Sequence, residues 1–145
     1  MKNIKLKLIK IIKLRKQYGF NGYIHLKGIP KADRLLIERA GNYVDRMSFN
    51  VELPSENSLK ILAPQKSKDA IFKPMKLLSD EAFQDHRPVK KRSFLPAGQT
   101  TQMIVGASPE SDGQIVRLTQ GLYKKYSLKR VYFSSYVPTN ETNSM

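Results

Sequence analysis

Short segments with bulky apolar residues at every second position alternate along this chain with segments of helical periodicity, and this order constrains the fold most strongly. The expected strands are Tyr23–Lys27, Arg46–Glu52, Thr100–Gly106 and Arg130–Ser135. The expected helices are a first one that ends near Gly19 and Gly22, followed by Asp33–Ala40, Ser55–Leu62, Ala70–Phe83 and Ser111–Tyr126. Strands that alternate with helices over short connections form parallel sheets with right-handed crossovers. We therefore expect an α/β fold with about four parallel strands.

Several residues set the expected bounds of these helices. Gly41 follows the second helical segment and is expected at its C′ position. Pro74 is expected to begin or break the Ala70–Phe83 segment. Glu110 and Asp112 precede or open the last helix, where acidic side chains cap the helix and interact favourably with its dipole. A ligand contact is the alternative role for Glu110.

Each expected strand separates apolar from polar side chains. In the second strand Met47 and Phe49 share one face, whereas Ser48, Asn50 and Glu52 share the other. A sheet buried on both faces would show continuous apolar runs. Alternation is instead typical of barrel strands whose inner face meets a ligand, with a one-sided sheet and a solvated face as the alternative. The polar face is expected to carry His25, Asn50, Glu52, Gln102 and Tyr132.

The length favours part of a barrel rather than a whole one. A complete TIM-type (β/α) barrel spans typically about 250 residues, whereas this chain has 145. We therefore expect a partial TIM-type (β/α) barrel, with about four parallel strands alternating with helices. The expected domain covers residues 1–138, and residues 139–145 are expected to form a disordered tail.

The positive charge is concentrated at the start of the chain. The net charge is +14, and the first 32 residues hold nine of the 26 Lys and Arg residues and no acidic residue. There the shared helical face of Ile4, Leu8, Ile11, Ile12 and Tyr18 predicts a helix that packs on the core with a basic solvent face. A helix that binds a membrane surface or nucleic acid is the alternative. Because no apolar run there exceeds two residues, we expect no signal peptide, no membrane span and a cytoplasmic protein.

Three stretches of the chain are long and unusual, and they carry a family resemblance. They are NVELPSE at residues 50–56, LAPQK at residues 62–66 and PAGQTTQMIVGASPESD at residues 96–112. Together with their surroundings, over residues 3–138, they resemble the middle of the radical S-adenosylmethionine (radical SAM) proteins assigned to DNA modification or repair. The resemblance implies a biotin-synthase-like barrel. It also implies a partner, either the missing barrel half or a uracil-DNA-glycosylase-like protein.

The chain departs from this family at the residues that carry its chemistry. Radical SAM enzymes hold a [4Fe–4S] cluster through a CxxxCxxC loop, and S-adenosylmethionine chelates the remaining iron. This chain contains no cysteine, so it cannot supply the three thiolates. We therefore expect an internal fragment that is inactive alone, with S-adenosylmethionine and the cluster bound only in the full-length family. Whether the chain belongs to a working enzyme stays open.

The resemblance also implies candidate cofactor-binding residues. They are Ser48, Asn50, Glu52, Gln99, Thr101 and Gln102. By the resemblance, Asn50 and Glu52 would hydrogen-bond the nucleoside or the α-ammonium group of S-adenosylmethionine. The alternatives are a polar strand end that caps the next helix and, for the later residues, an ordinary loop. The two histidines, His25 and His86, are too few for a metal site.

Basic clusters in expected loops are candidates for nucleic-acid contacts. They are Lys66, Lys68, Lys90, Lys91 and Arg92. Such clusters are either solvated surface or phosphate contacts, and the net charge of +14 fits the second interpretation. Three functions are therefore open. The chain is a fragment of a radical SAM enzyme that acts on nucleic acid, a basic nucleic-acid-binding module without catalytic activity, or a folded remnant without a biochemical role.

Overall fold

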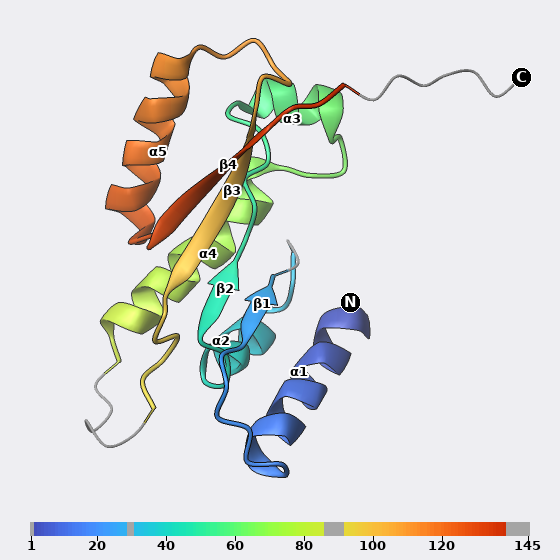
Figure 1. The fold of residues 1–145 in the computed structure, drawn as a ribbon, viewed down its shortest axis with the longest axis vertical. Coiled ribbons are helices and arrows are strands. Elements are labelled where there is room, and N and C mark those ends of the chain that lie inside the picture. Colours follow the sequence, from blue (N-terminus) through green and yellow to red (C-terminus); the bar gives the residue numbers. More distant parts are fainter. Residues whose placement is uncertain (1, 29–30, 86–91, 139–145) are drawn as a thin grey trace, which may run out of the picture.

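A sheet of four parallel strands forms the centre of the molecule (Figure 1). The computed structural model describes residues 2–28, 31–85 and 92–138. The strands are β1 (His25–Lys27), β2 (Arg46–Ser48), β3 (Gln99–Val105) and β4 (Arg130–Ser135), and they lie in the order β1-β2-β3-β4. All three neighbouring pairs of these strands are parallel. The expected α/β class and parallel pairing are therefore confirmed.

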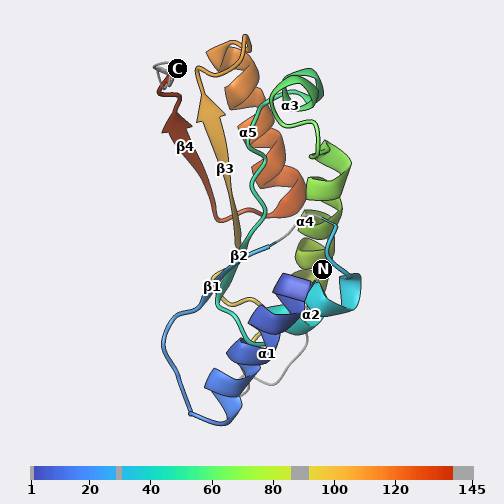
Figure 2. The same cartoon turned by 90° about the vertical axis from the view of Figure 1, so that its right-hand side faces the viewer.

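The helices lie together on one side of this sheet and leave its other face open (Figure 2). They are α1 (Lys2–Lys16), α2 (Arg34–Gly41), α3 (Glu56–Leu62), α4 (Lys68–Phe83) and α5 (Asp112–Tyr126). Strands that follow the chain order, with their crossovers on one side, are compatible with part of a β/α barrel. The described strands form an open sheet with β1 and β4 at its edges. The expected tail at residues 139–145 lies outside the described residues.

The core lies between the helices and the sheet face that they cover. Met47, Phe49 and Met103 are 0% exposed on that face, and they pack with the buried Ile71 and Met75 of α4. Each buried side chain of this size contributes about 1.5–3 kcal/mol to folding. The predicted alternation along β2 and β3 thus decides which face attaches to the helices and which remains open.

Polar side chains begin four of the helices. The N-cap residues are Asp33, Ser55, Ser67 and Ser111. Each accepts a hydrogen bond from a backbone N–H that has no partner within the first turn. In α5 the side chain of Gln114 completes a capping box with Ser111. Ser111 therefore caps α5, whereas Asp112, the expected cap, is its first helical residue.

Two expected helix bounds were wrong. Gly41 is the last residue of α2 rather than its C′ residue, and Asn42 is the C-cap in a right-handed conformation. A glycine suits this place because a Cβ atom at residue 41 would lie 2.2 Å from the ring of Phe94. Pro74 lies inside α4, which starts earlier at Lys68. The absence of one N–H group does not end this helix, because its buried face holds it on the core.

Helix α1 packs on the core as predicted, with one exception. Ile4, Leu8 and Ile11 are buried, which confirms the core-packing face. Tyr18 is 67% exposed, because α1 ends at Lys16 and the helical period does not extend to residue 18. Arg15 lies on the buried side of α1, and its side chain is 10% exposed.

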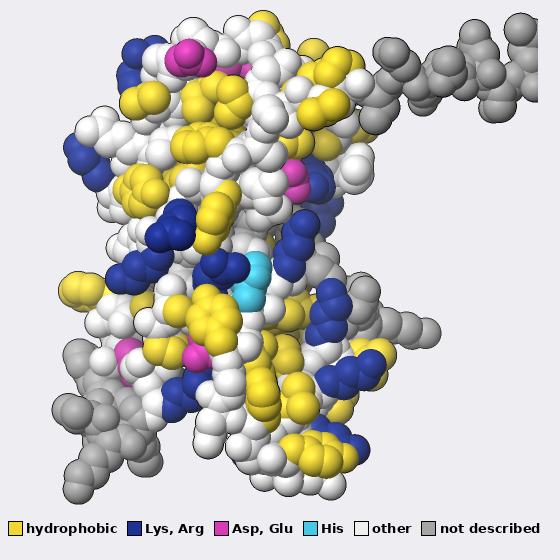
Figure 3. Space-filling model, viewed as in Figure 1, with side chains coloured by type: hydrophobic (Ala, Val, Ile, Leu, Met, Phe, Trp, Pro, Cys, Tyr) yellow, Lys and Arg dark blue, Asp and Glu magenta, His cyan; other side chains and the backbone are white. Residues whose placement is uncertain are grey.

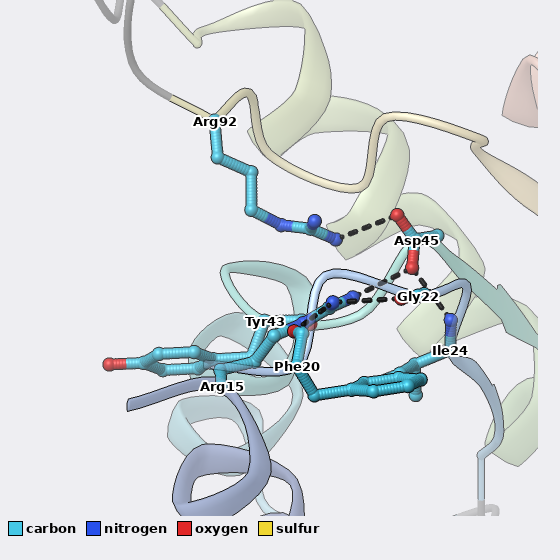
Figure 4. Close-up of polar contacts among 7 residues, drawn as sticks. All are labelled: Arg15, Phe20, Gly22, Ile24, Tyr43, Asp45 and Arg92. Atoms are coloured by element: carbon cyan, nitrogen blue, oxygen red, sulfur yellow. Dashed lines mark hydrogen bonds and ion pairs between the residues drawn. The ribbon is translucent and has the colours of Figure 1, made fainter. Parts of the chain in front are cut away.

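Arg15 and Asp45 form a polar network that joins α1 to the sheet (Figure 4). The Arg15 guanidinium donates to a carboxylate oxygen of Asp45 at 2.8 Å, and the same oxygen accepts from the backbone N–H of Ile24 at 2.7 Å. Arg15 also donates to the backbone carbonyl groups of Tyr43, Phe20 and Gly22. Arg92 binds the other carboxylate oxygen of Asp45 at 3.0 Å. Since Asp45 immediately precedes β2 and Ile24 immediately precedes β1, this carboxylate connects α1 to the starts of both strands.

Candidate functional site

A groove of about 360 Å³ lies on the open face of the sheet. The described residues that line it are His25, Lys27, Arg46, Ser48, Asn50, Thr100, Thr101, Gln102 and Tyr132. None of these lining residues is acidic. In the space-filling view the cyan His side chain marks the middle of this face, with Lys and Arg side chains around it (Figure 3). The open face is therefore polar and positively charged.

The strand register assembles this groove from residues far apart in the sequence. His25 lies opposite Arg46, and Gln102 lies opposite Tyr132. Because alternate residues of a strand share a face, pairing in this register places one polar side chain of each strand beside another across the sheet. The predicted location of His25, Gln102 and Tyr132 on the open face is confirmed.

A chain of hydrogen bonds connects the groove residues. A guanidinium nitrogen of Arg46 lies 2.8 Å from His25 Nδ1, and His25 Nε2 lies 2.9 Å from the hydroxyl of Ser48. A guanidinium only donates hydrogen bonds, so Nδ1 is the acceptor and the neutral ring carries its proton on Nε2. That proton is donated to the Ser48 oxygen. The hydroxyl proton of Ser48 is then free to bind an acceptor on a ligand.

The charges around the groove keep His25 neutral. Its partial burial, together with the nearby cations Arg46 and Lys27, lowers the pKa of His25 below its ordinary value of 6.5. At neutral pH the fixed positive charge on this face is therefore carried by guanidinium and ammonium groups rather than by the imidazole.

Tyr132 contacts two arginines. Arg46 donates to its hydroxyl at 3.0 Å, and the guanidinium carbons of Arg46 and Arg130 each lie 5.8 Å from the centre of its ring. Burial acts to raise the pKa of Tyr132, but hydrogen bonds from Arg130 and Arg46 outweigh it and the pKa is lowered. The Nε atom of Arg46 is buried and has no hydrogen-bond partner. These contacts fix a cation and an aromatic ring side by side.

Three of the predicted cofactor-binding residues lie in the groove with free or exchangeable polar groups. Ser48 and Asn50 line it from β2 and the residues after it, and Gln102 lines it from β3. The amide of Gln102 lies 3.2 Å from the hydroxyl of Ser134. Amide and hydroxyl groups of this kind bind the polar edges of planar ligands.

The polar groups of Thr101 and Gln99 form structural hydrogen bonds within the protein. Thr101 borders the groove, but its hydroxyl donates to the carbonyl of Phe49 and accepts from the N–H of Val51. Gln99 is 3% exposed, and its amide donates to the carbonyl groups of Met75 and Tyr126, both at 2.8 Å. Gln99 therefore does not reach the groove, whereas Thr101 borders it with a hydroxyl that the backbone already occupies.

Glu52 is not among the residues that line the groove with Ser48 and Asn50. Ser48 pairs with Thr100, but Glu52 pairs with Met103. Four steps along one strand therefore match three along the other, which is the geometry of a bulge. Glu52 has a positive φ of 67°, and its carboxylate forms an ion pair with Lys66 at 3.0 Å.

The predicted basic clusters are only partly available to a ligand. Lys66 is paired with Glu52, and the ammonium group of Lys68 donates to the carbonyl of Pro54. Burial lowers the pKa of Lys68, although the carboxylates of nearby acids oppose this. Arg92 binds Asp45. Lys90, Lys91 and His86 lie outside the described residues.

Glu110 does not cap α5, whose N-cap is Ser111, and it contacts the start of α3 instead. Its carboxylate accepts hydrogen bonds from the hydroxyls of Ser55 and Ser58 at the start of α3. Burial acts to raise the pKa of Glu110, but hydrogen bonds from Ser108, Ser55 and Ser58 lower it to about 2. Glu110 thus connects the loop after β3 to α3, which sequence distance alone did not indicate.

Sequence reasoning missed the cations of the groove. Arg46 and Lys27 were not among the candidate residues, although the alternation along their strands places both on the same face as residues predicted on the open face. Lys27 lies two residues after His25, and Arg46 lies two residues before Ser48, so each shares a face with that residue. The alternation therefore contained the signal for both residues. The candidates for nucleic-acid contacts were chosen from charge clusters in loops, and single basic residues within strands were not included.

Comparison with protein-family models, with curated proteins and with solved structures finds no match to this chain. The resemblance to radical SAM proteins therefore stays a prediction. Within the described residues, no group of three or more His, Asp or Glu residues is placed to hold a metal ion. Among the helices that the structure describes, none combines the length and apolarity needed to cross a membrane.

Proposed function

We propose that the open sheet face binds a single strand of nucleic acid, and that the chain is a nucleic-acid-binding part of a β/α barrel. The observation that carries this proposal is the groove that Arg46, Lys27 and Tyr132 line, with no acidic residue among its lining residues. Phosphate groups bind to arginine and lysine, and unpaired bases stack on aromatic rings. The groove offers both, because Arg46 contacts the hydroxyl and the ring of Tyr132.

The hydrogen-bonding groups of the groove support a nucleotide rather than a simple anion. Asn50 and Gln102 present amides that match the edge of a base, and Ser48 has a hydroxyl proton to donate. A volume of about 360 Å³ lies within the range of small-molecule sites. A phosphate on Arg46 with its base toward Tyr132 would therefore use every class of side chain in the groove.

The radical SAM resemblance fits this proposal as a non-catalytic role. A radical SAM cluster needs three thiolates, and the chain contains no cysteine. The residues present do not fit the cluster, so no chemical step is assigned to this chain. In the proposed arrangement the groove holds a nucleic-acid substrate or the nucleoside part of S-adenosylmethionine, and residues outside this chain supply the chemistry.

Binding of a short oligothymidylate tests the proposal. A labelled strand of about four nucleotides is titrated with protein, and its fluorescence anisotropy is followed at several salt concentrations. Arg46→Gln is expected to weaken binding about tenfold, because it removes a charged hydrogen bond to phosphate. The slope of log affinity against log salt should fall by about 0.7, the value for one phosphate contact of a single strand. Lys27→Gln should act in the same direction.

The matched control is Arg117→Gln, which removes one exposed charge from α5 on the opposite side of the sheet. It should leave the affinity unchanged within about twofold. Equal losses in the Arg46 and Arg117 variants would show that general charge, and not the groove, binds the strand. Circular dichroism of each variant confirms that the fold is retained.

A further inference from the structure

Helix α1 presents a second basic surface that the groove does not include. Its lysines Lys5, Lys7, Lys10, Lys13 and Lys16 are exposed. No acidic residue lies in α1. In the part of the chain that the structure describes, none of these five lysines forms an ion pair. Their charge is therefore available to a partner.

This surface is held rigidly on the molecule. The opposite side of α1 buries Ile4, Leu8 and Ile11 in the core, and the ion pair of Arg15 with Asp45 fixes its last turn to the sheet (Figure 4). A helix that is anchored in this way presents its lysines in a fixed order. It binds an extended polyanion without first having to fold.

The basic surface of α1 lies next to the β1 edge of the sheet and is visible from the side that carries the groove (Figure 1). In the space-filling view, Lys and Arg side chains continue from the cyan His side chain over the neighbouring region of α1 (Figure 3). Figure 1, drawn in the same view, shows α1 next to the β1 edge of the sheet. The two basic surfaces therefore adjoin at the β1 edge of the sheet.

We infer that a single strand of nucleic acid continues from the groove along α1, with its phosphates on the exposed lysines. This inference rests on the proposed function of the groove and extends it to a longer ligand. Helix α1 has 15 residues and is about 22 Å long. At about 3.4 Å per nucleotide, a stacked strand places roughly six phosphates along it.

The arrangement of apolar residues disfavours a lipid surface as the partner. A helix that lies on a bilayer inserts a continuous apolar face. In α1 that face is the buried one of Ile4, Leu8 and Ile11. Leu6 and Ile9 are 53% and 55% exposed, but this pair, one turn apart, is flanked by Lys5, Lys10 and Lys13 and does not form a continuous apolar face. The charge pattern therefore fits a phosphate backbone better than a membrane.

Two oligothymidylates and a triple variant test this inference. The strands have about four and about 12 nucleotides, so that only the longer one spans both the groove and α1. The variant Lys5→Gln, Lys10→Gln and Lys13→Gln keeps helix-forming residues in α1. It should weaken binding of the longer strand at least tenfold and lower its salt slope by about 2, which corresponds to three phosphate contacts. Binding of the shorter strand should stay within about twofold.

The control triple variant is Lys73→Gln, Lys76→Gln and Lys124→Gln. These three lysines are exposed on α4 and α5. The control variant has the same net charge as the α1 variant and should bind both strands as the wild-type protein does. Equal affinity of the wild-type protein and the α1 variant for the longer strand would overturn the inference. The same holds if the control variant weakens binding as much as the α1 variant.

The outcomes separate this inference from the proposed function. If Arg46→Gln weakens both strands while the α1 variant weakens neither, the groove binds nucleic acid and the path along α1 is wrong. If Arg46→Gln has no effect on either strand, the proposed function itself fails. Sedimentation with vesicles of anionic phospholipid tests whether α1 binds a lipid surface instead. Vesicle binding that the α1 variant loses, without an effect on the longer strand, would assign α1 to a lipid surface.

Discussion

Arg15 shows how one charged residue becomes part of the interior at the junction of a helix and a sheet. It interrupts the apolar face of α1, yet it is largely buried because Asp45 and three backbone carbonyl groups satisfy its guanidinium. A buried cation is tolerated only when it is paired and hydrogen-bonded. The network therefore explains why the helical face of α1 looks imperfect in the sequence.

The network predicts a large effect of a small change at Asp45. Asp45→Asn removes the negative charge that faces both Arg15 and Arg92. We expect the free energy of unfolding to fall by about 2–4 kcal/mol, since an unpaired charge is left in a partly buried site. Urea denaturation followed by circular dichroism measures this loss.

Asp69→Asn is the control for this prediction. Asp69 pairs with Lys73 on the exposed side of α4, where both side chains are more than 70% exposed. The loss of such a pair should cost less than about 0.5 kcal/mol. Similar losses in the two variants would show that Asp45 is no more than a surface ion pair.

The helices show how the same residue type serves different purposes in different elements. Gly121 lies within α5, where a Cβ atom would meet no other atom within 4 Å. Gly41 ends α2, where a Cβ atom would lie 2.2 Å from the ring of Phe94. Glycine is thus required by packing in α2 and has no packing role in α5.

Opposite effects are therefore expected from the same substitution in the two helices. Gly121→Ala should raise the free energy of unfolding by about 0.5–1 kcal/mol, because alanine restricts the unfolded chain and favours the helix. Gly41→Ala should lower it by about 1–3 kcal/mol, because Phe94 must move. Thermal or urea unfolding measures both, and effects of the same sign would contradict this reading of α2 and α5.

At the scale of the whole molecule, the sheet has an uncovered edge at β4. This strand pairs with β3 on one side, and no further strand among the described residues pairs with its other side. Phe133 of β4 is 52% exposed. Unpaired edge strands with exposed apolar side chains promote association between chains.

The edge predicts that Phe133→Lys reduces aggregation. A lysine on an edge strand disfavours pairing with another chain, so light scattering of a concentrated solution should fall about twofold or more relative to the wild-type protein. Gln120→Lys adds the same charge on the exposed side of α5 and should have little effect. A similar decrease in both variants would show that net charge, rather than the β4 edge, controls association.

The sequence by itself determined the features that depend on neighbouring residues. The alternation of side chains predicted the two faces of the sheet, and the bounds of β4 agree with the expected Arg130–Ser135. Ser55 and Ser111 begin α3 and α5 where their segments were expected to start. These features follow from local periods and caps, which one segment contains in full.

Only the tertiary structure decided how the segments meet. The offset in pairing at Glu52 depends on its bridge to Met103, and the bond between Arg46 and Tyr132 joins residues 86 positions apart. Gln99 reads as a candidate ligand in its loop, but its amide bonds to α4 and α5 in the core. Register and packing depend on the partner strand and on the helices above it, and a one-residue shift exchanges the two faces. For that reason the strand alternation predicted the open face, whereas the residues that form its groove were set by the assembled sheet.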